Sequence, residues 1–437
     1  MSSTLKQSNG LTMDYSSYKT DLSKRRRPVI TRELVKIASS ASQSLVTLAE
    51  GAPNEKTFPF TEISVKLDDG TSFTLEENEL STALQYIPTQ GYPPLLQTLR
   101  EFQRRVHAPP LWESRDIVIV AGAQDGLSKT LESVIGTGDP ILVPDPFYPG
   151  VEVVVTPHQA ELISIPQDDL GVIPEDMREI LRNRQLSGKK MPKIMYVNAT
   201  GANPTGVIIP LERRKEIYRL ACEYDFLILD DDPYCFISYS DEKPKSFLSL
   251  DTEGRVIRVD SFSKVISSGM RVGFITAAAP LLASIELHLQ SSHLHAPALS
   301  QVMLYKLLKI WGHKGMMNHV NRIQHFYKER RDMIVSLAKT HLNGLVDFAV
   351  PSSGFFLWME IRGIEDTWKM MMQRGVAQGV IMAPGASFTK DPTKPCNAIR
   401  ASFSKASYEE MNLAMERLAQ LIREELADRD ALQNLNS

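Results

Sequence analysis

A lysine follows two serines in the segment Ser261-Phe262-Ser263-Lys264, and an arginine stands seven residues further on at Arg271. A lysine amine forms a Schiff base with an aldehyde only when it is neutral, and a tuned site provides that state. The serine hydroxyls and the guanidinium can donate hydrogen bonds to a phosphate. Together these groups indicate an aldehyde cofactor that carries a phosphate, namely pyridoxal 5'-phosphate (PLP). A solvated surface lysine is the alternative, because most lysines are exposed.

Two further loops each follow a short apolar run. The segment Val120–Gly126 leads into a predicted helix at Leu127–Ile135, and its small residues expose backbone N–H groups that can cradle a phosphate. An ordinary strand-to-helix turn is the alternative. In Asn198–Gly206, Asn203 could donate to a phenolate-type oxygen, with its backbone fixed by Pro204. Asn-Pro also marks ordinary turns, so this loop alone decides nothing.

Three adjacent carboxylates, Asp230-Asp231-Asp232, form the start of another loop, which continues to Tyr234. A carboxylate that meets a pyridine nitrogen keeps it protonated, so that the ring accepts electrons. Tyr234 could share the ring hydroxyl with Asn203. Three carboxylates also suit Mg²⁺ or Ca²⁺. Since neither EF-hand spacing nor a phosphate-transfer motif accompanies them, we expect no metal.

An arginine near the end of the chain, Arg400, stands at the start of a predicted strand, Ile399–Phe403. Its planar guanidinium offers two parallel donors to a substrate carboxylate, although a surface salt bridge is equally consistent with the sequence. The carboxyl ends of parallel strands lie along one edge of a sheet, where ligands bind. We therefore expect the loops that follow strands to converge on one site.

The elements that must position these groups alternate along the middle of the chain. Short runs rich in Val and Ile are separated by amphipathic segments such as Leu211–Tyr224. Continuous apolar strands separated by helices indicate a mainly parallel sheet covered on both faces. We predict an α/β fold with a seven-stranded sheet, whose strands are Ile117–Val120, Ile141–Val143, Glu161–Ile165, Ile194–Val197, Leu227–Leu229, Val256–Val259 and Val272–Thr276.

The pattern changes after Pro297, where longer helical patterns and fewer strands predict a smaller α+β domain. The predicted helices are Val302–Ile310, Gly315–Leu342, Thr367–Gly375 and Ser407–Leu426, and the strands are Phe355–Ile361 and Ile399–Phe403. A short helix is also expected at Thr31–Ala41. We expect a flexible arm at 1–27, an N-terminal segment at 28–83 on the small domain and a dimer partner, a large domain at 84–310 and a small domain at 311–437.

Composition excludes several classes of protein. The chain has 437 residues, 43% hydrophobic and 23% charged, and these are globular values that predict two to three domains. A net charge of −3 gives no reason to expect nucleic acid or an anionic membrane as a partner. Three scattered cysteines favour a reducing compartment, and neither a membrane span nor a secretory signal is expected. We expect the cytoplasm, with the mitochondrion left open.

The motifs occur together in an order that resembles the fold-type I PLP-dependent aminotransferases. Asn-Pro-Thr-Gly, Asp-x-x-Tyr, Ser-x-Ser-Lys and the two arginines follow one another at similar spacing. The chain is similar in particular to the branch of kynurenine/α-aminoadipate and fungal aromatic aminotransferases. That likeness extends from about Pro28 to Leu426 and is carried by Ala83–Tyr86, Asp260–Lys264, Ser267–Gly269, Phe356–Trp358 and Arg400–Ser404. It implies a three-layer α/β/α large domain that binds PLP.

The resemblance implies a role for each candidate residue. Lys264 would form the Schiff base and shuttle the proton, Asp231 would pair with the pyridinium nitrogen, and Tyr148 would stack on the ring. Further cofactor contacts would come from Ala123, Gln124, Asn203, Tyr234, Ser261, Ser263 and Arg271, and from Tyr86, which would reach the phosphate of the neighbouring subunit in a homodimer. The substrate would be held by Arg400, at its α-carboxylate, and by Asn203, Gly51 and Phe356.

Two positions depart from the pattern of the family. Ala123 stands where relatives often have a serine, so one hydroxyl is lost from the phosphate loop. Ile30 falls where relatives that accept aminoadipate or kynurenine often have an arginine, although Arg32 could compensate. An apolar residue cannot pair with a distal carboxylate. We therefore expect a preference for aromatic or aliphatic side chains over aminoadipate.

The resemblance implies ping-pong transamination between an aromatic or related L-amino acid (kynurenine, aminoadipate, phenylalanine, tyrosine class) and a 2-oxo acid such as 2-oxoglutarate. A PLP-dependent lyase or decarboxylase on the same scaffold is the first alternative, because a fold does not fix a reaction. A PLP-binding regulatory protein is the second. It would need an N-terminal DNA-binding domain, and we expect none, because only about 27 residues precede the similarity.

Overall fold

The computed structural model describes residues 13–40, 48, 49, 51–240 and 244–436. Its centre is an eight-stranded sheet in the order β3-β10-β9-β8-β7-β4-β5-β6. The strands are β3 (Arg115–Val120), β4 (Pro140–Asp145), β5 (Glu161–Asp168), β6 (Gly171–Val172), β7 (Ile194–Val197), β8 (Leu227–Asp231), β9 (Val256–Ser261) and β10 (Gly273–Ala278). Only β10 and β6 run against the others, so the prediction of a mainly parallel sheet is confirmed. The eighth strand, β6, has only two residues and was not predicted.

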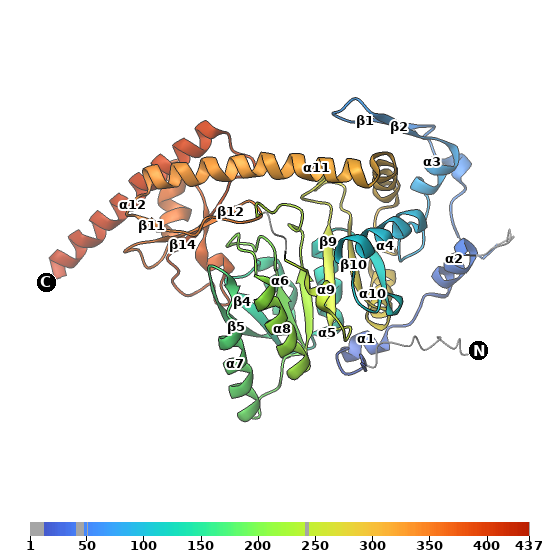
Figure 1. The fold of residues 1–437 in the computed structure, drawn as a ribbon, viewed down its shortest axis with the longest axis horizontal. Helices are drawn as coiled ribbons and strands as arrows, with labels where there is room; N and C mark the ends of the chain where they lie inside the picture. The colour runs from blue at the N-terminus through green and yellow to red at the C-terminus, as the bar shows by residue number, and fades with distance from the viewer. Residues whose placement is uncertain (1–12, 41–47, 50, 241–243, 437) are drawn as a thin grey trace.

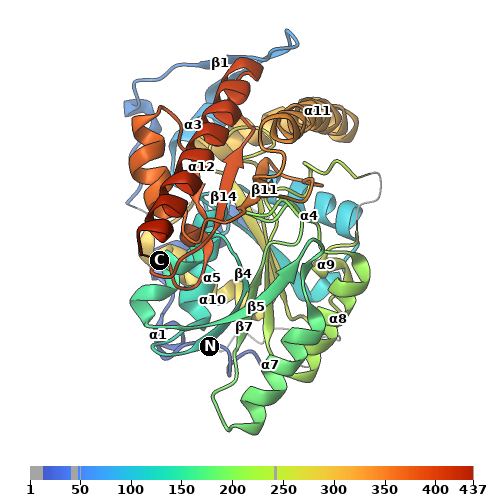
Figure 2. The same ribbon diagram turned by 90° about the vertical axis from the view of Figure 1, so that its left-hand side faces the viewer.

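Helices cover both faces of this sheet (Figure 2). One face packs against α5 (Ala123–Val134), α6 (Pro149–Val155) and α10 (Ala279–Ser292), and the other against α7 (Pro174–Leu186), α8 (Leu211–Glu223) and α9 (Phe247–Leu250). In β7, Tyr196 belongs to the first core while Met195 and Val197 belong to the second. The strand is buried on both faces, which explains its continuous apolar sequence.

The long helix α11 (Ala298–His341) joins the large domain to the small one (Figure 1). Its backbone breaks at Gly312, where φ is +55°, a conformation that glycine adopts without steric strain. The two helices predicted here, Val302–Ile310 and Gly315–Leu342, are the two halves of α11 on either side of this kink. Its first half packs with α4 (Pro93–His107), and its second half contributes to the core of the small domain.

The small domain contains a four-stranded antiparallel sheet in the order β11-β12-β14-β13. Its strands are β11 (Val346–Asp347), β12 (Phe356–Ile361), β13 (Ala383–Pro384) and β14 (Ala398–Ser402). It packs against α12 (Tyr408–Asn436) and a π-helical segment at Met370–Gly375, where the sequence predicts an α-helix. Short 3₁₀ turns lie at Glu55–Thr57, Trp112–Ser114, Thr156–His158 and Gly385–Phe388. None of the helices in the described part of the chain is long and apolar enough to cross a membrane.

The N-terminal residues from Met13 onward pack against the large domain. Tyr15 and Tyr18 are buried, and α1 (Asp21–Arg25) follows them. The Tyr15 hydroxyl donates to the Gly254 carbonyl at 3.1 Å, and the Tyr18 hydroxyl donates to the Asp225 carboxylate at 2.5 Å. The prediction of a flexible arm at 1–27 is therefore wrong for this stretch, because two buried aromatic side chains anchor it. Residues 1–12 lie outside the described residues.

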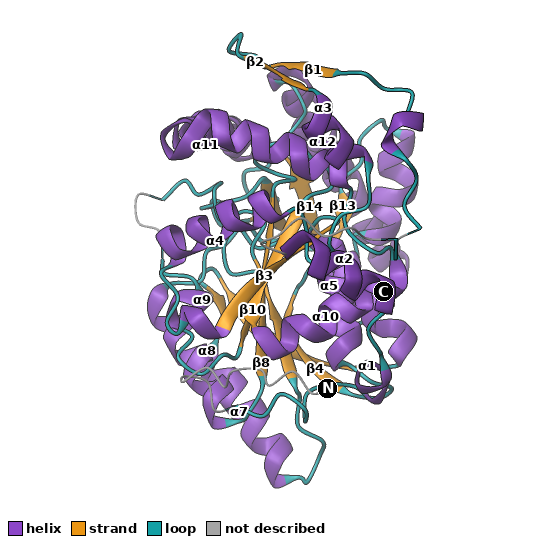
Figure 3. Ribbon diagram, turned by 90° about the vertical axis from the view of Figure 1, so that its right-hand side faces the viewer, coloured by secondary structure: helices purple, strands orange, loops and turns teal. Residues whose placement is uncertain are grey.

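The following segment carries α2 (Ile30–Ser40), a hairpin of β1 (Ile63–Lys66) and β2 (Ser72–Leu75), and α3 (Glu77–Leu84) (Figure 3). Its apolar side chains, among them Leu75, pack on Val302 in the first half of α11. Asp68 in the hairpin pairs with Arg322 in the second half, at 2.7 Å. The segment thus contacts α11 on both sides of the expected domain boundary. The predicted helix end at Ala41 lies outside the described residues.

Candidate active site

A pocket of about 240 Å³ lies at the carboxyl edge of the large sheet, where β7, β8 and β9 end. It brings together every predicted cofactor residue except Tyr86, and also Phe356 from the small domain. The lining consists of Ala123, Gln124, Leu127, Tyr148, Asn198, Asn203, Asp231, Pro233, Tyr234, Ser261, Ser263, Lys264, Ser268, Arg271 and Phe356. The expected convergence of the strand-end loops is what places these residues together.

Lys264 lies in this pocket at the end of the β9 loop, with its amine 5.9 Å from the ring centroid of Phe355. Burial lowers the pKa of Lys264, and the nearby cations Arg271 and Arg400 lower it further, whereas Asp231 opposes them. The folded protein thus favours the neutral amine more than water does. That is the state in which an amine attacks a carbonyl.

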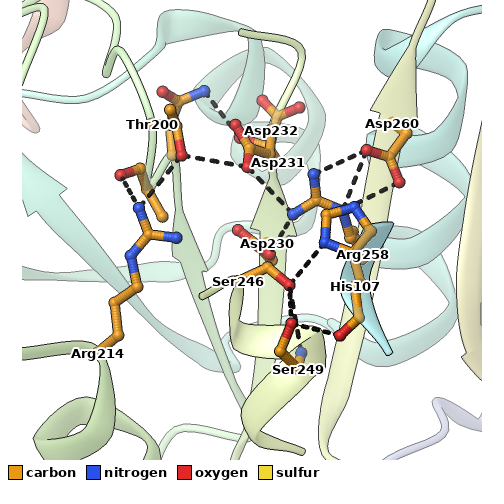
Figure 4. Close-up of polar contacts among 12 residues, drawn as sticks. His107, Thr200, Arg214, Asp230, Asp231, Asp232, Ser246, Ser249, Arg258 and Asp260 are labelled. Atoms are coloured by element: carbon orange, nitrogen blue, oxygen red, sulfur yellow. Dashed lines mark hydrogen bonds and ion pairs between the residues drawn. The ribbon is translucent and has the colours of Figure 1, made fainter. Parts of the chain in front are cut away.

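Asp231, the last residue of β8, is buried and lines the pocket. Figure 4 shows its position beside Asp230 and Asp232. Its Oδ2 accepts a hydrogen bond from the Tyr196 hydroxyl at 3.0 Å, and its backbone carbonyl accepts one from the Asn198 amide at 2.8 Å. Its Oδ1 has no partner among the described residues. Burial raises the pKa of Asp231 to about 7. A buried carboxylate with one unsatisfied oxygen fits a cationic N–H donor, such as a pyridinium.

The opposite end of the pocket is suited to a phosphate. It is formed by the N-terminus of α5, the two serines of the lysine loop and Arg271. The Arg271 guanidinium donates to the Ser263 hydroxyl at 3.3 Å and to the Ala121 carbonyl at 2.9 Å. Gly122 has a φ of +86°, and a Cβ there would lie 2.3 Å from the Arg271 guanidinium, so only glycine allows this close approach. Backbone N–H groups and a cation thus face the same space, as anion sites require.

Arg400, in β14 of the small domain, does not line this pocket but adjoins it through Asn203, and three neighbours hold it. Its Nη1 donates to Asn203 Oδ1 at 2.8 Å, and its guanidinium lies 4.3 Å from the Phe356 ring and 4.7 Å from the Phe388 ring. Its Nε has no hydrogen-bond partner among the described residues. Burial lowers the pKa of Arg400. A half-buried guanidinium without a carboxylate partner among the described residues is suited to an anionic ligand.

Aromatic rings form the remaining walls. Tyr148 precedes α6, and burial raises the pKa of its phenol. Burial also raises the pKa of Tyr234, whose ring meets Phe356 edge-on with centroids 6.0 Å apart. These flat surfaces can hold a planar heterocycle and an aromatic side chain.

Tyr86, Gly51, Ile30 and Arg32 also lie outside the pocket. Tyr86 is 51% exposed and packs edge-on against His295 with ring centroids 6.0 Å apart. Gly51 is exposed, and Ile30, at the start of α2, is 70% exposed. Arg32 is buried and donates to Thr89 at 3.3 Å and to the Ile87 carbonyl. In the single chain, Tyr86, Gly51 and Ile30 therefore lie at the surface, and Arg32 is hydrogen-bonded to Thr89 and to the Ile87 carbonyl.

The sequence missed Tyr196, Asn198, Ser268 and Phe388, which shape the pocket or its key residues. Asn198 was detectable, because it directly follows a predicted strand. Tyr196 was not, since inside an apolar strand it reads as core.

The carboxylates on either side of Asp231 are paired with an arginine. Asp230 and Asp232 pair with Arg258 at 2.9 and 3.1 Å. The described residues contain no group of three or more side chains that could hold a metal ion. The positive charge that neutralises Asp230 and Asp232 comes from Arg258.

Comparison with known proteins gives consistent matches over nearly the whole chain. Residues 44–418 match the family model of the class I and II aminotransferases. The chain is 41% identical to the mitochondrial kynurenine/alpha-aminoadipate aminotransferase of Mus musculus, over 95% of this chain and 100% of that protein. The aromatic aminotransferase Aro9 of C. albicans has a TM-score of 0.84 at 25% identity, covering 95% and 99% of the two chains. A kynurenine aminotransferase of Pyrococcus horikoshii, solved with PMP, KYN and KYA, has a TM-score of 0.76 at 29% identity, covering 94% and 98%.

Proposed function

The chain belongs to the class I and II aminotransferases, a family of PLP-dependent transaminases, and we propose that it transfers amino groups from aromatic and related L-amino acids to a 2-oxo acid such as 2-oxoglutarate. The observation that carries the proposal is one pocket with three chemical groups in or beside it. The pocket is lined by a lysine amine with a lowered pKa and by a buried carboxylate with one oxygen that has no partner among the described residues. A half-buried arginine adjoins it through Asn203.

The residues of the pocket fit PLP from both ends. The free Oδ1 of Asp231 would accept from the pyridinium N–H, and Asn203 and Tyr234 would hold the phenolate oxygen. The α5 N-terminus, Ser261, Ser263, Arg271 and the residues Ala123 and Gln124 would hold the phosphate, with Tyr148 against the ring. When bound, PLP supplies an electron sink that stabilises negative charge at the substrate Cα.

Each protein group then has a definite task. Lys264 Nζ would hold the cofactor, and as a free amine it would act as the general base that removes the proton from the substrate Cα. The lowered pKa of Lys264 favours the neutral form that this step needs. Arg400 binds the α-carboxylate with two donors, while Asn203 and the Phe356 and Phe388 rings fix the plane of its guanidinium.

The side chain of the substrate is expected to be apolar or aromatic. Tyr148, Tyr234 and Phe356 line the pocket, and these walls favour a flat apolar group. Ile30 offers no charge to a distal carboxylate. The bonds that Arg32 makes to Thr89 and to the Ile87 carbonyl keep its guanidinium in the body of its own subunit. Phenylalanine, tyrosine and kynurenine are therefore proposed ahead of aminoadipate as donors.

The active unit is proposed to be a homodimer in which Tyr86 reaches the phosphate of the neighbouring subunit and Gly51 approaches the substrate. The exposure of both residues in the single chain supports this proposal. Mixing inactive Lys264→Ala subunits with inactive Tyr86→Phe subunits tests it, because sites shared between subunits would regain activity in the hybrid.

The proposed compartment is the cytoplasm, where three free cysteines remain reduced. The name of the mouse relative includes the word mitochondrial, so subcellular fractionation of the native protein decides between the two.

A panel of amino donors with 2-oxoglutarate, read by formation of both products, tests the reaction. Transamination gives one 2-oxo acid per glutamate, whereas a decarboxylase or lyase releases product without the acceptor. Lys264→Ala should abolish turnover and the visible absorbance of the bound cofactor. The matched control Lys306→Ala, whose amine pairs with Glu79 at 2.8 Å, should keep both. An active, yellow Lys264→Ala protein would contradict the assignment.

A further inference from the structure

A buried ion cluster lies on the face of the sheet opposite Asp231 (Figure 4). Its centre is Arg258, whose side chain is fully buried. The guanidinium pairs with Asp230 at 2.9 Å, with Asp232 at 3.1 Å and with Asp260 at 2.8 Å. One cation thus holds three buried carboxylates, none of which lines the cofactor pocket.

The strand register connects this cluster to the active site. β8 and β9 are parallel neighbours, and Arg258 lies opposite Asp230. Because side chains alternate along a strand, the partners of Arg258 point away from the pocket while the residues next to them point toward it. Asp230 and Asp232 flank Asp231, and Asp260 precedes Ser261 in the loop that carries Lys264.

The other hydrogen bonds to the three carboxylates come from neutral groups, and a second buried cation, Arg214, acts on Asp230 and Asp232 without pairing directly with them. Gln103 donates to Asp260 Oδ2 at 2.6 Å, and Thr200 donates to Asp232 Oδ2 at 3.2 Å. The Oδ1 atoms of Asp230 and Asp232 have no partners within the described part of the chain. Without the Arg258 guanidinium, the three buried carboxylates would lose the ion pairs that they make at 2.8 to 3.1 Å, which is strongly unfavourable.

We propose that Arg258 is a positioning residue for transamination, which joins the carboxyl ends of β8 and β9 and so fixes Asp231 relative to Lys264. The proposal rests on the proposed function, since the roles of Asp231 and Lys264 do. Arg258 also has an electrostatic task, because its charge offsets those of Asp230 and Asp232 beside Asp231. It thereby keeps the carboxylate that faces the cofactor ionised.

The charges around Asp231 support this second task. Burial is the largest influence and raises the pKa of Asp231, the bond from Tyr196 lowers it, Asp232 and Asp230 raise it, and Arg258 lowers it. Lys264, Tyr148 and Tyr234 also interact electrostatically with Asp231, and Arg214 acts on the neighbouring Asp230. Loss of Arg258 therefore raises the pKa of Asp231, and the ionised carboxylate is lost at a higher pH than in the native protein.

The test compares PLP affinity across pH in holoenzymes of the wild type and Arg258→Met. We expect the acid-side midpoint of PLP binding to move up by about one pH unit in the variant. Adding Asp230→Asn to Arg258→Met should return the midpoint at least half of the way, because one opposing charge is removed. A weaker affinity with an unmoved midpoint would overturn the electrostatic task.

The control is Arg115→Met, which breaks another fully buried pair, with Asp251 at 2.6 Å, at the opposite edge of the sheet. It should lower stability without moving the midpoint, and an equal shift in both variants would overturn the proposal.

If the methionine variant does not fold, Asp230→Asn alone tests the electrostatic task, and it should move the midpoint down because Asp230 raises the pKa of Asp231. Arg258→Lys keeps the charge but not the planar fork, so it tests the positioning task separately. It should leave the midpoint in place and lower kcat about tenfold. Unchanged kcat would overturn the positioning task. Failure of the wild-type protein to bind PLP would instead contradict the proposed function itself.

Discussion

The Tyr196 hydroxyl donates a 3.0 Å hydrogen bond to Asp231 Oδ2 across the neighbouring strands β7 and β8. Both side chains are buried, and Tyr196 is packed within the core beneath the sheet edge. This bond occupies the Oδ2 atom of Asp231, while its Oδ1 atom has no partner among the described residues. The strand pair therefore orients the carboxylate without any contribution from a cofactor.

Replacing Tyr196 with phenylalanine should weaken PLP binding about tenfold or more, because a hydrogen bond to a charged group contributes roughly 1.5–3 kcal/mol. The pKa of Asp231 should also rise, since the bond from Tyr196 lowers it. PLP titration followed by absorbance measures the first effect. The matched control is Tyr218→Phe, which removes a buried 3.0 Å bond to Asp251. Equal losses of affinity in the two variants would contradict a specific role for Tyr196.

Asp231→Asn should make the PLP-free protein more stable above neutral pH while abolishing transamination. The folded-state pKa of Asp231 is about 7, raised from 3.8 by burial. Between these values the folded state holds more protons than the unfolded state, so this residue lowers stability as pH rises. The difference in unfolding free energy between variant and wild type should therefore grow from about pH 4 to about pH 7 and then level off. Denaturation at a series of pH values measures it, and a constant difference would show that Asp231 is not the cause.

Phe388→Leu should raise KM for amino donors about three- to tenfold, with a smaller change in kcat. Phe388 lies 4.7 Å from the Arg400 guanidinium, and such a cation–π contact contributes roughly 0.5–2 kcal/mol. The control is Phe326→Leu, which removes a contact of 5.3 Å to Arg330 away from the pocket. KM values that match the wild type would show that Asn203 and Phe356 suffice to fix Arg400.

Much of the large domain could be predicted because its strands are buried on both faces. Ile194–Val197 is apolar at every position and is a strand with those same bounds. β6 was missed because two residues, Gly171 and Val172, leave no periodic pattern. The π-helical form of Met370–Gly375 was missed as well, since its composition is that of an α-helix.

The site could be predicted where a chemical group follows a strand, as with Asp231 after Leu229. Side chains that act from inside an element could not. Arg258 reads as a lone charge in an apolar strand, and only the register with Asp230 reveals its partners. The burial of Tyr15 and Tyr18 depends on contacts more than two hundred residues away in sequence, to Gly254 and Asp225, which no local pattern encodes.

Tyr18→Ala should lower the free energy of unfolding by about 3 kcal/mol, because it removes a buried aromatic ring. The ring is 3% exposed, and its hydroxyl donates to Asp225 at 2.5 Å. Urea denaturation measures the loss. The control Tyr408→Ala, at a side chain that is 51% exposed, should change stability by less than about 0.5 kcal/mol. A neutral Tyr18→Ala would mean that this N-terminal stretch adds little to the fold.

Ile30→Arg should raise kcat/KM for aminoadipate relative to phenylalanine about tenfold, by pairing with the distal carboxylate of the substrate. Ile30 is 70% exposed, so an arginine fits there without disturbing the core. Arg32 does not already supply this charge, because its guanidinium is bound to Thr89 and to the Ile87 carbonyl. Steady-state kinetics with both donors measures the change.

The control for Ile30→Arg is Ile37→Arg on the same helix, where the native side chain is 57% exposed. It adds the same charge about two turns further along α2, so a general effect of charge on substrate attraction would appear in both variants. A wild-type preference for aminoadipate would contradict the premise, because it would show that Ile30 does not limit recognition of a second carboxylate. A gain in Ile30→Arg alone places this residue at the side-chain end of the substrate, and in a homodimer that end lies where two subunits meet.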